Sequence, residues 1–179
     1  GIRQGQRLLV HLDNCPEAML VFFACAELSA VAVTTNARSS GAEIAYFAEN
    51  AEVVAAITEP RFAELVAGHA RDITWRAITA ADGGQAPAAA RAGGKAEAFA
   101  AIDGDPADVP ARPADPALPL SVQFTSGTTS RPKIVLITHA NALWGGRVNA
   151  QNQAFGRDDV HLTYLPLFHM NAQCYSVWT

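Results

Sequence analysis

The chain has 179 residues, half of them apolar, which is enough to build one domain of ordinary size or slightly more around a sizeable core. Its formal net charge is −4, and it has no basic run or RNA-binding aromatic pattern, so nucleic acid is not an expected partner. Three cysteines without a C-x-x-C pair argue against a disulfide framework or a zinc site and favour the reducing cytoplasm.

The first 80 residues alternate between apolar strand-like runs and helical segments. We expect strands at residues 7–12, 30–35, 53–58 and 73–78, and helices at residues 16–29, 41–50 and 60–70. Pro16 and Pro60 suit the first position of a helix. Ser40 and Glu43 form the S-x-x-E pattern of a capping box. This order predicts an α/β fold, a parallel sheet flanked by helices and joined by right-handed crossovers.

The most apolar stretch, residues 18–33, is too short to cross a bilayer and is interrupted by Glu27 and Ser29, so we expect no membrane span. The chain begins without an initiator Met and ends within an apolar segment. We therefore expect it to be part of a longer protein.

Residues 81–117 differ in composition, since Ala, Gly, Pro and Asp dominate them. Such a segment buries too little apolar surface to offset the entropy of ordering, and we expect a surface loop or connector. A domain boundary is the alternative. The chain then divides into a βαβ-rich subdomain at 1–80, this connector, and a third region at 118–179.

The third region begins with two strands around a polar loop. We expect strands at residues 119–125 and 133–138 in a hairpin-like arrangement, a helix from about 140 to 155, a strand at 158–165, a loop at 166–171 and a final helix. Thr138 can cap the first of these helices.

The loop at residues 125–133 reads TSGTTSRPK and carries the chemistry. Small residues let backbone N–H groups approach an anion, and hydroxyls add donors that suit phosphate oxygens. Lys133 adds a positive charge, and Arg131 offers a planar one. A Ser/Thr-rich surface turn is the alternative. The two flanking strands favour a ligand-binding loop.

Two common nucleotide motifs are excluded at this loop. A Walker A loop needs a second Gly before the Lys and a Ser or Thr after it, but Pro132 and Ile134 occupy those positions. In addition, a strand follows where a helix is required. The G-x-G-x-x-G fingerprint of dinucleotide-binding folds is also missing from the sequence.

The loop resembles the signature of the adenylate-forming superfamily, which includes acyl-CoA synthetases, aryl-CoA ligases, luciferases and the adenylation domains of peptide synthetases. Residues 124–129 (FTSGTT), Pro132-Lys133 and the later residues 138–141 (THAN) fall in register with that pattern. Ser130 and Ile134 depart from it, because Gly is usual at both positions. The resemblance implies part of the large N-terminal domain of such an enzyme. It also implies that ATP is bound by Thr125, Ser126, Gly127, Thr128, Thr129, Ser130 and Lys133.

A second segment, residues 164–171 (YLPLFHMN), is similar to the family's P-L-F/Y-H segment near the acyl pocket. The resemblance makes His169 the candidate catalytic residue, one that orients the substrate carboxylate. Capping of the next helix is the alternative role. Residues 168–173 (FHMNAQ) also resemble carnitine- and crotonobetaine-type ligases.

The remaining motifs receive a structural interpretation or none. Residues 32–44 resemble an upstream family segment, and we interpret them as a turn with a helix cap. His139 is interpreted as part of a helix start. No role is assigned to His11, His69 or His161, and no metal ligand is assigned.

The resemblance implies a carboxylate–CoA ligase. A carboxylic acid reacts with ATP to give acyl-AMP, and CoA then displaces AMP, with Mg²⁺ held mainly by phosphate oxygens and water. The family's Y-G-x-T-E motif, ribose-binding Asp and C-terminal catalytic Lys are not found in this sequence. We therefore expect the chain alone to be inactive. The alternatives are a non-catalytic relative that acts as a binding or interaction protein, and a Rossmann-type oxidoreductase.

Overall fold

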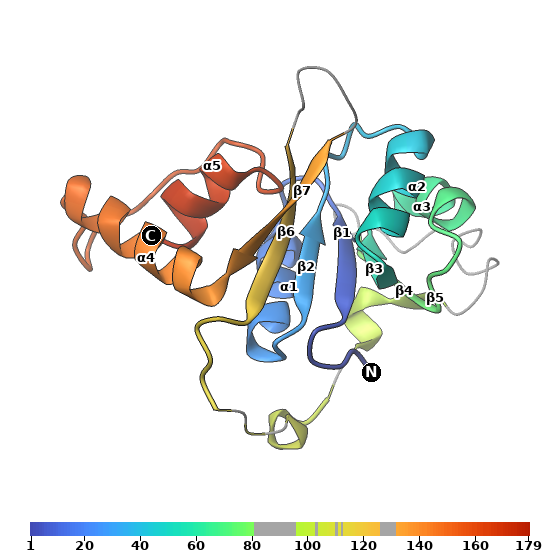
Figure 1. The fold of residues 1–179 in the computed structure, drawn as a ribbon, viewed down its shortest axis with the longest axis horizontal. Helices are drawn as coiled ribbons and strands as arrows, with labels where there is room; N and C mark the ends of the chain where they lie inside the picture. The colour runs from blue at the N-terminus through green and yellow to red at the C-terminus, as the bar shows by residue number, and fades with distance from the viewer. Residues whose placement is uncertain (81–95, 103, 110, 112, 126–131) are drawn as a thin grey trace.

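A seven-stranded sheet runs through the part of the chain that the computed structural model describes (Figure 1). The described residues are 1–80, 96–102, 104–109, 111, 113–125 and 132–179. The strands are β1 (Arg7–His11), β2 (Val31–Thr34), β3 (Val53–Thr58), β4 (Trp75–Ile78), β5 (Ala96–Ala98), β6 (Pro119–Thr125) and β7 (Lys133–Thr138). Their order is β5-β4-β3-β1-β2-β6-β7, and every neighbouring pair is parallel except β6 and β7. The α/β fold and the hairpin-like pairing are confirmed.

Helices cover both faces of this sheet. They are α1 (Pro16–Glu27), α2 (Gly41–Asn50), η1 (Pro60–Phe62), α3 (Ala63–His69), η4 (Phe99–Ala101), η5 (Pro106–Asp108), α4 (His139–Asn152), α5 (Met170–Ala172) and the π-helical η6 (Gln173–Val177). The predicted cap of α2 is present, since Ser40 Oγ accepts from the Glu43 N–H and Glu43 accepts from the Ser40 N–H. Thr138 and Asn141 form the same reciprocal cap at α4.

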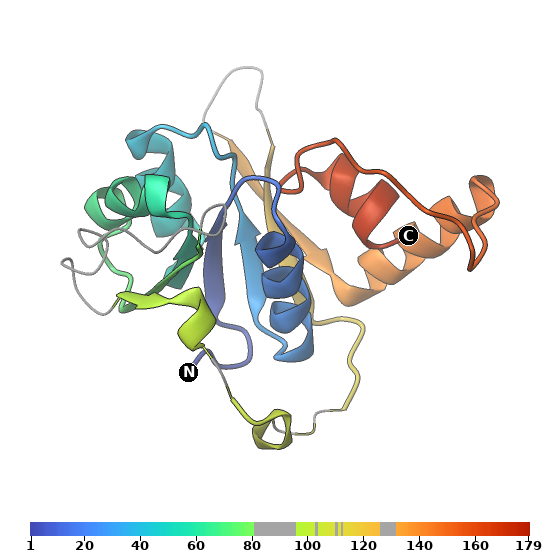
Figure 2. The same ribbon diagram turned by 180° about the vertical axis from the view of Figure 1, so that it is seen from behind.

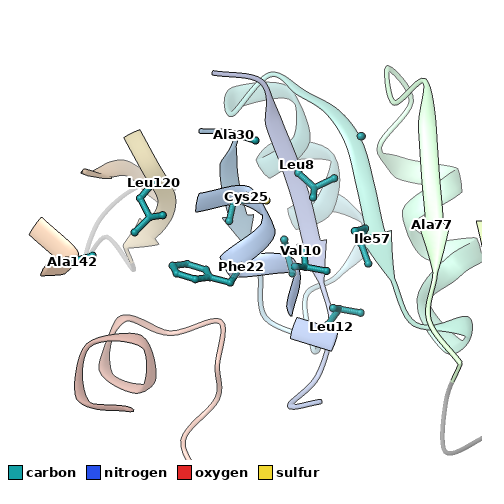
Figure 3. Close-up of a cluster of buried hydrophobic side chains, with 13 residues drawn as sticks. Leu8, Val10, Leu12, Phe22, Cys25, Ala30, Ile57, Ala77, Leu120 and Ala142 are labelled. Carbon is teal, nitrogen blue, oxygen red and sulfur yellow. The ribbon is translucent and has the colours of Figure 1, made fainter. Parts of the chain in front are cut away.

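Two apolar clusters, one on each face, hold the layers together. On one face, Leu8 and Val10 of β1 pack with α1 residues such as Phe22 and Cys25 (Figure 3). On the other face, Leu9 packs with residues of α2 and α3. Side chains that alternate along a strand point to opposite faces, so β1 supplies both clusters. Figures 1 and 2 show α1 on one side of the sheet and α2 with α3 on the other.

The C-terminal helices lie beside α1 on the same face (Figure 2). Ala142 of α4 belongs to the α1 cluster, and Val177 and Trp178 pack against it. Among the helices that the structure describes, none is long and apolar enough to cross a membrane.

The structure corrects two predictions. The expected strand at 158–165 is wrong, because these residues adopt neither strand nor helix. Val160, Leu162 and Tyr164 alternate as a strand would, yet their exposed fractions are 97%, 84% and 83%. Conversely, β5 lies within the predicted connector at 81–117 and pairs with β4. The division into three regions stays a prediction, and residues 81–95, 103, 110 and 112 lie outside the described residues.

Candidate functional site

The segment at residues 165–168 crosses the carboxyl edge of the sheet, where the parallel strands end. The Asn14 side chain follows β1 and holds this segment twice: its Nδ2 donates to the Leu165 carbonyl at 2.9 Å, and its Oδ1 accepts from the Leu167 N–H at 2.7 Å. Thr34, the last residue of β2, donates from Oγ1 to the Phe168 carbonyl at 2.9 Å. In open α/β sheets this edge is the usual place for a ligand.

The two ends of the predicted phosphate loop meet at the same edge. Thr125 ends β6 and Lys133 begins β7, and the two residues pair across the antiparallel ladder. Both are exposed, and the Lys133 ammonium makes no ion pair with any residue that the structure describes. The predicted residues Ser126, Gly127, Thr128, Thr129 and Ser130 lie outside the described residues, as does Arg131.

An aromatic group that the sequence analysis missed supports the base of this loop. The Tyr46 hydroxyl on α2 donates to the Pro132 carbonyl at 2.9 Å. Phe124, next to Thr125 on β6, packs against Phe47 with ring centroids 4.1 Å apart. The signal in the sequence was the pair of adjacent aromatics within α2, but their target could not be known without the fold.

Of the two departures from the family loop, only Ile134 is described. It lies within β7, opposite Phe124 of β6. A β-branched residue suits a paired strand position, so Ile134 is accounted for by the ladder.

His169 lies immediately after the segment at 165–168 and is exposed. Its Nδ1 accepts from the Asn171 N–H at 3.2 Å, so it caps α5. Because Nδ1 accepts, the neutral ring carries its proton on Nε2. The two roles considered for His169 are therefore compatible, since an exposed Nε2–H can donate to a carboxylate while Nδ1 caps the helix. His139 is the first residue of α4, as the helix-start interpretation expects.

A cluster of charged side chains lies at the carboxyl ends of β1 and β3, beside the crevice where the sheet order reverses. Glu59 accepts from the Asp13 N–H at 2.6 Å and from Arg61 Nε at 2.7 Å, and Arg61 also pairs with Asp13 at 3.0 Å. The pKa of Asp13 is lowered, first by the Asn14 N–H that donates to its carboxylate and then by Arg61. Doubly wound enzymes bind dinucleotides at this crevice. Here Asp13, Glu59 and Arg61 pair with one another beside it.

His11 is fully buried beneath this crevice, although the sequence analysis gave it no role. Its Nδ1 lies 2.9 Å from Thr35 Oγ1, and its ring meets Phe62 edge-on at 4.8 Å. Burial lowers the pKa of His11 from 6.5 to about 4. The imidazole is thus neutral and structural.

The His11 pKa predicts how stability depends on pH. Between pH 6.5 and about 4 the unfolded chain binds a proton that the folded chain does not, so the free energy of unfolding falls as pH falls. The full loss below pH 4 is roughly 3 kcal/mol. Urea unfolding of the chain at several pH values measures this slope. His11→Asn should flatten it, whereas the matched change at the exposed His161, His161→Asn, should leave it intact.

Among the described residues, no group of three His, Cys, Asp or Glu side chains is arranged to hold a metal ion. All three cysteines are free. Burial raises the pKa of the Cys25 thiol to about 12, so Cys25 behaves as an apolar core residue.

Comparison with known proteins supports the family resemblance and the fold. The family model described as AMP-binding enzyme matches residues 1–179. The crotonobetaine/carnitine–CoA ligase of Salmonella paratyphi A is 36% identical over 178 residues, which cover 97% of this chain and 34% of the relative. The same ligase of Salmonella enteritidis is 35% identical with equal coverage. The chain therefore spans about a third of the length of these relatives.

A solved structure gives the same result for the fold. The apo structure of MbtA from Mycobacterium smegmatis aligns with a TM-score of 0.80 and 28% identity. The alignment covers 99% of this chain and 33% of that one. Nearly all of the chain thus matches about a third of larger proteins.

Proposed function

The chain belongs to the AMP-binding enzyme family, and from this membership we propose that the protein is an adenylate-forming carboxylate–CoA ligase. It would activate a carboxylic acid with ATP as acyl-AMP and transfer the acyl group to CoA. The observation that carries the proposal is the meeting of Thr125, Lys133 and the segment before His169 at one edge of the sheet. The relatives' own activity with crotonobetaine or carnitine supports a carboxylate substrate.

The described residues are suited to binding a nucleoside triphosphate. Lys133 presents an ammonium without a protein counter-ion among the described residues, and the exposed Thr125 lies next to it, with its Oγ1 3.4 Å from the Lys133 carbonyl. Residues 125–133 would hold the β- and γ-phosphates, which leave as pyrophosphate. Mg²⁺, held by phosphate oxygens and water, would supply further charge neutralisation. The chain's contribution to the first step is positional and electrostatic.

His169 would act on the carboxylate. Its Nε2–H can donate to one carboxylate oxygen and turn the other toward the α-phosphate, while the cap to Asn171 fixes the ring. We assign it orientation of the acid and no proton transfer.

The test is pyrophosphate release by the full-length protein. Mg-ATP should yield pyrophosphate only when a carboxylate is added, and a panel of crotonobetaine, carnitine and short-chain fatty acids identifies the acid. Absence of Mg-ATP binding, together with no carboxylate-dependent pyrophosphate release, would favour the alternative of a non-catalytic relative. The oxidoreductase alternative loses support because the family model described as AMP-binding enzyme matches residues 1–179.

The 179-residue chain by itself should not form acyl-AMP at an ordinary rate. It spans 34% of its ligase relatives, and the motifs for ribose, metal and the catalytic Lys are missing from its sequence. A hydroxamate assay on the purified chain checks this. Acyl-hydroxamate formation at the rate of the full-length protein would contradict it.

We also propose a cytoplasmic location, which fractionation would test.

Tyr46→Phe should weaken nucleotide binding without unfolding the protein. The substitution removes the hydrogen bond to the Pro132 carbonyl and keeps the ring against Phe124. One hydrogen bond of about 1 kcal/mol corresponds to a rise of about 5-fold in KM for ATP. Phe47→Leu, a change in the same cluster that removes no hydrogen bond, separates packing from anchoring. An unchanged KM for ATP in Tyr46→Phe would show that this hydrogen bond does not anchor the loop.

A further inference from the structure

Three buried polar side chains from distant parts of the chain form one hydrogen-bonded group under the segment at 165–168. They are Thr34 of β2, Gln123 of β6 and Gln173 at the start of η6, with exposed fractions of 7%, 8% and 1%. Polar side chains are rarely buried to this degree unless hydrogen bonds compensate for lost water. We call these three residues the polar triad.

The hydrogen bonds of the polar triad are mutual. Gln123 Nε2 donates to Thr34 Oγ1 at 3.2 Å and to Gln173 Oε1 at 2.9 Å. Gln173 Nε2 donates to Thr34 Oγ1 at 3.2 Å and to the Leu167 carbonyl at 3.1 Å. The Thr34 hydroxyl therefore accepts two N–H groups and donates its own proton to the Phe168 carbonyl. Every donor of the three side chains is used, which leaves the triad little freedom to rearrange.

The polar triad touches both halves of the proposed site. On one side Thr34 holds the Phe168 carbonyl, which belongs to the peptide unit joined to His169. The backbone N–H of Gln173 also donates to the His169 carbonyl at 3.1 Å. On the other side Gln123 precedes Thr125 by two residues in β6, so both side chains lie on the same face of that strand. β6 leads directly into residues 125–133.

We propose that Thr34, Gln123 and Gln173 are positioning residues that fix His169 relative to the phosphate-binding loop. The inference rests on the proposed function and adds the device that aligns its two substrates. In-line attack by a carboxylate on a phosphorus atom depends steeply on geometry, and a misplacement of about 1 Å lowers the rate by about 100-fold. A rigid link between β6 and the peptide before His169 meets that requirement. Hydrogen bonds made only for stability would not need to join these two parts of the site.

Thr34 offers a matched pair of variants for the test. In the full-length protein, Thr34→Val keeps the side-chain shape and removes the hydroxyl at the centre of the triad, whereas Thr34→Ser keeps the hydroxyl. Thr34→Val should lower kcat for carboxylate-dependent pyrophosphate release by about 10- to 100-fold, with the Kd for Mg-ATP changed by less than about 3-fold. Thr34→Ser should restore most of kcat. These assays use the carboxylic acid from the panel above with which the wild-type protein is most active.

A second variant covers the case in which Thr34→Val does not fold. Gln173→Met keeps the volume of the side chain and removes its hydrogen bonds to Thr34, Gln123 and Leu167. The control is Asn149→Ala, because Asn149 donates to the Cys174 carbonyl at 3.3 Å and so holds the residue next to Gln173 without reaching β6. Gln173→Met should lower kcat, and Asn149→Ala should leave kcat unchanged.

The outcomes separate this inference from the function on which it rests. If Thr34→Val lowers the melting temperature and leaves kcat per folded molecule unchanged, the triad is only structural. If Thr34→Val does not fold, the same result in Gln173→Met leads to the same conclusion. A wild-type protein that releases no pyrophosphate with any acid would overturn the proposed function and this inference together.

Discussion

Lys133→Ala in the full-length protein should lower kcat/KM for carboxylate-dependent pyrophosphate release by about 10- to 100-fold, which corresponds to the loss of one charge-assisted contact of roughly 1.5–3 kcal/mol. The contact would be to a phosphate that gains charge as pyrophosphate leaves, so kcat should fall along with the affinity for ATP. Lys133 is exposed at the first position of β7, and the melting temperature should therefore stay within a degree or so of the wild type.

The matched control is Arg147→Ala. Arg147 is an exposed cation on α4, outside the proposed site. Its removal changes the net charge of the chain by the same amount and should leave the kinetics unaltered. Equal losses in both variants would mean that general charge, and not the loop, attracts ATP. Unaltered activity in Lys133→Ala would remove the role proposed for this lysine.

Gly146→Ala should destabilise the chain by roughly 1–2 kcal/mol, because a methyl group at this position of α4 would overlap the backbone carbonyl of Trp178. A side chain at the neighbouring Gly145 would also be crowded, because a Cβ added there would lie 3.2 Å from Cys174 Sγ. Helix α4 thus depends on two adjacent glycines to approach the segment that includes the polar triad's Gln173. The loss is a net value, because Ala is otherwise preferred over Gly in a helix by about 1 kcal/mol.

Gly68→Ala should instead stabilise the chain. Gly68 lies in α3, and nothing is within 4 Å of its would-be Cβ. The chain should gain about 0.5–1 kcal/mol from helix propensity alone. Denaturant unfolding of both variants measures the two signs. Hydrogen exchange in Gly146→Ala should rise first in residues 170–179, and a gain in stability for this variant would contradict the close packing of α4.

Elements with clear boundaries in the sequence could be predicted. Helix α2 and strand β3 have the predicted bounds, since Ser40 and Glu43 cap the helix and the strand is a continuous apolar run. Strands β6 and β7 also match, because the polar loop between them marks both inner ends.

The errors come from interactions that act between distant parts of the chain. The sequence of β5 has no strand pattern, and β5 exists because it pairs with β4. Residues 158–165 have the alternation of a strand, but a strand requires a neighbouring strand to pair with. No described strand forms a ladder with these residues. Local pattern is therefore a poor guide wherever the partner decides the structure.

The candidate site shows the same limit. The loop at 125–133 could be found because its motif is contiguous, whereas the polar triad joins residues 89, 50 and 139 positions apart. Tyr46 likewise reaches Pro132 across 86 positions. A contiguous motif reveals which groups meet the ligand, and only the fold reveals which groups hold them in place.

The antiparallel pair β6 and β7 also sets which changes the loop can tolerate. Thr125 and Lys133 oppose each other on one rung of the ladder, so the pairing of β6 with β7 fixes both ends of the loop. Deletion of a single residue inside β7 is different, because a shift of one position exchanges the two faces of a strand and would turn the lysine to the opposite side. The ladder thus fixes the position of the Lys133 backbone independently of which residue stands at position 130.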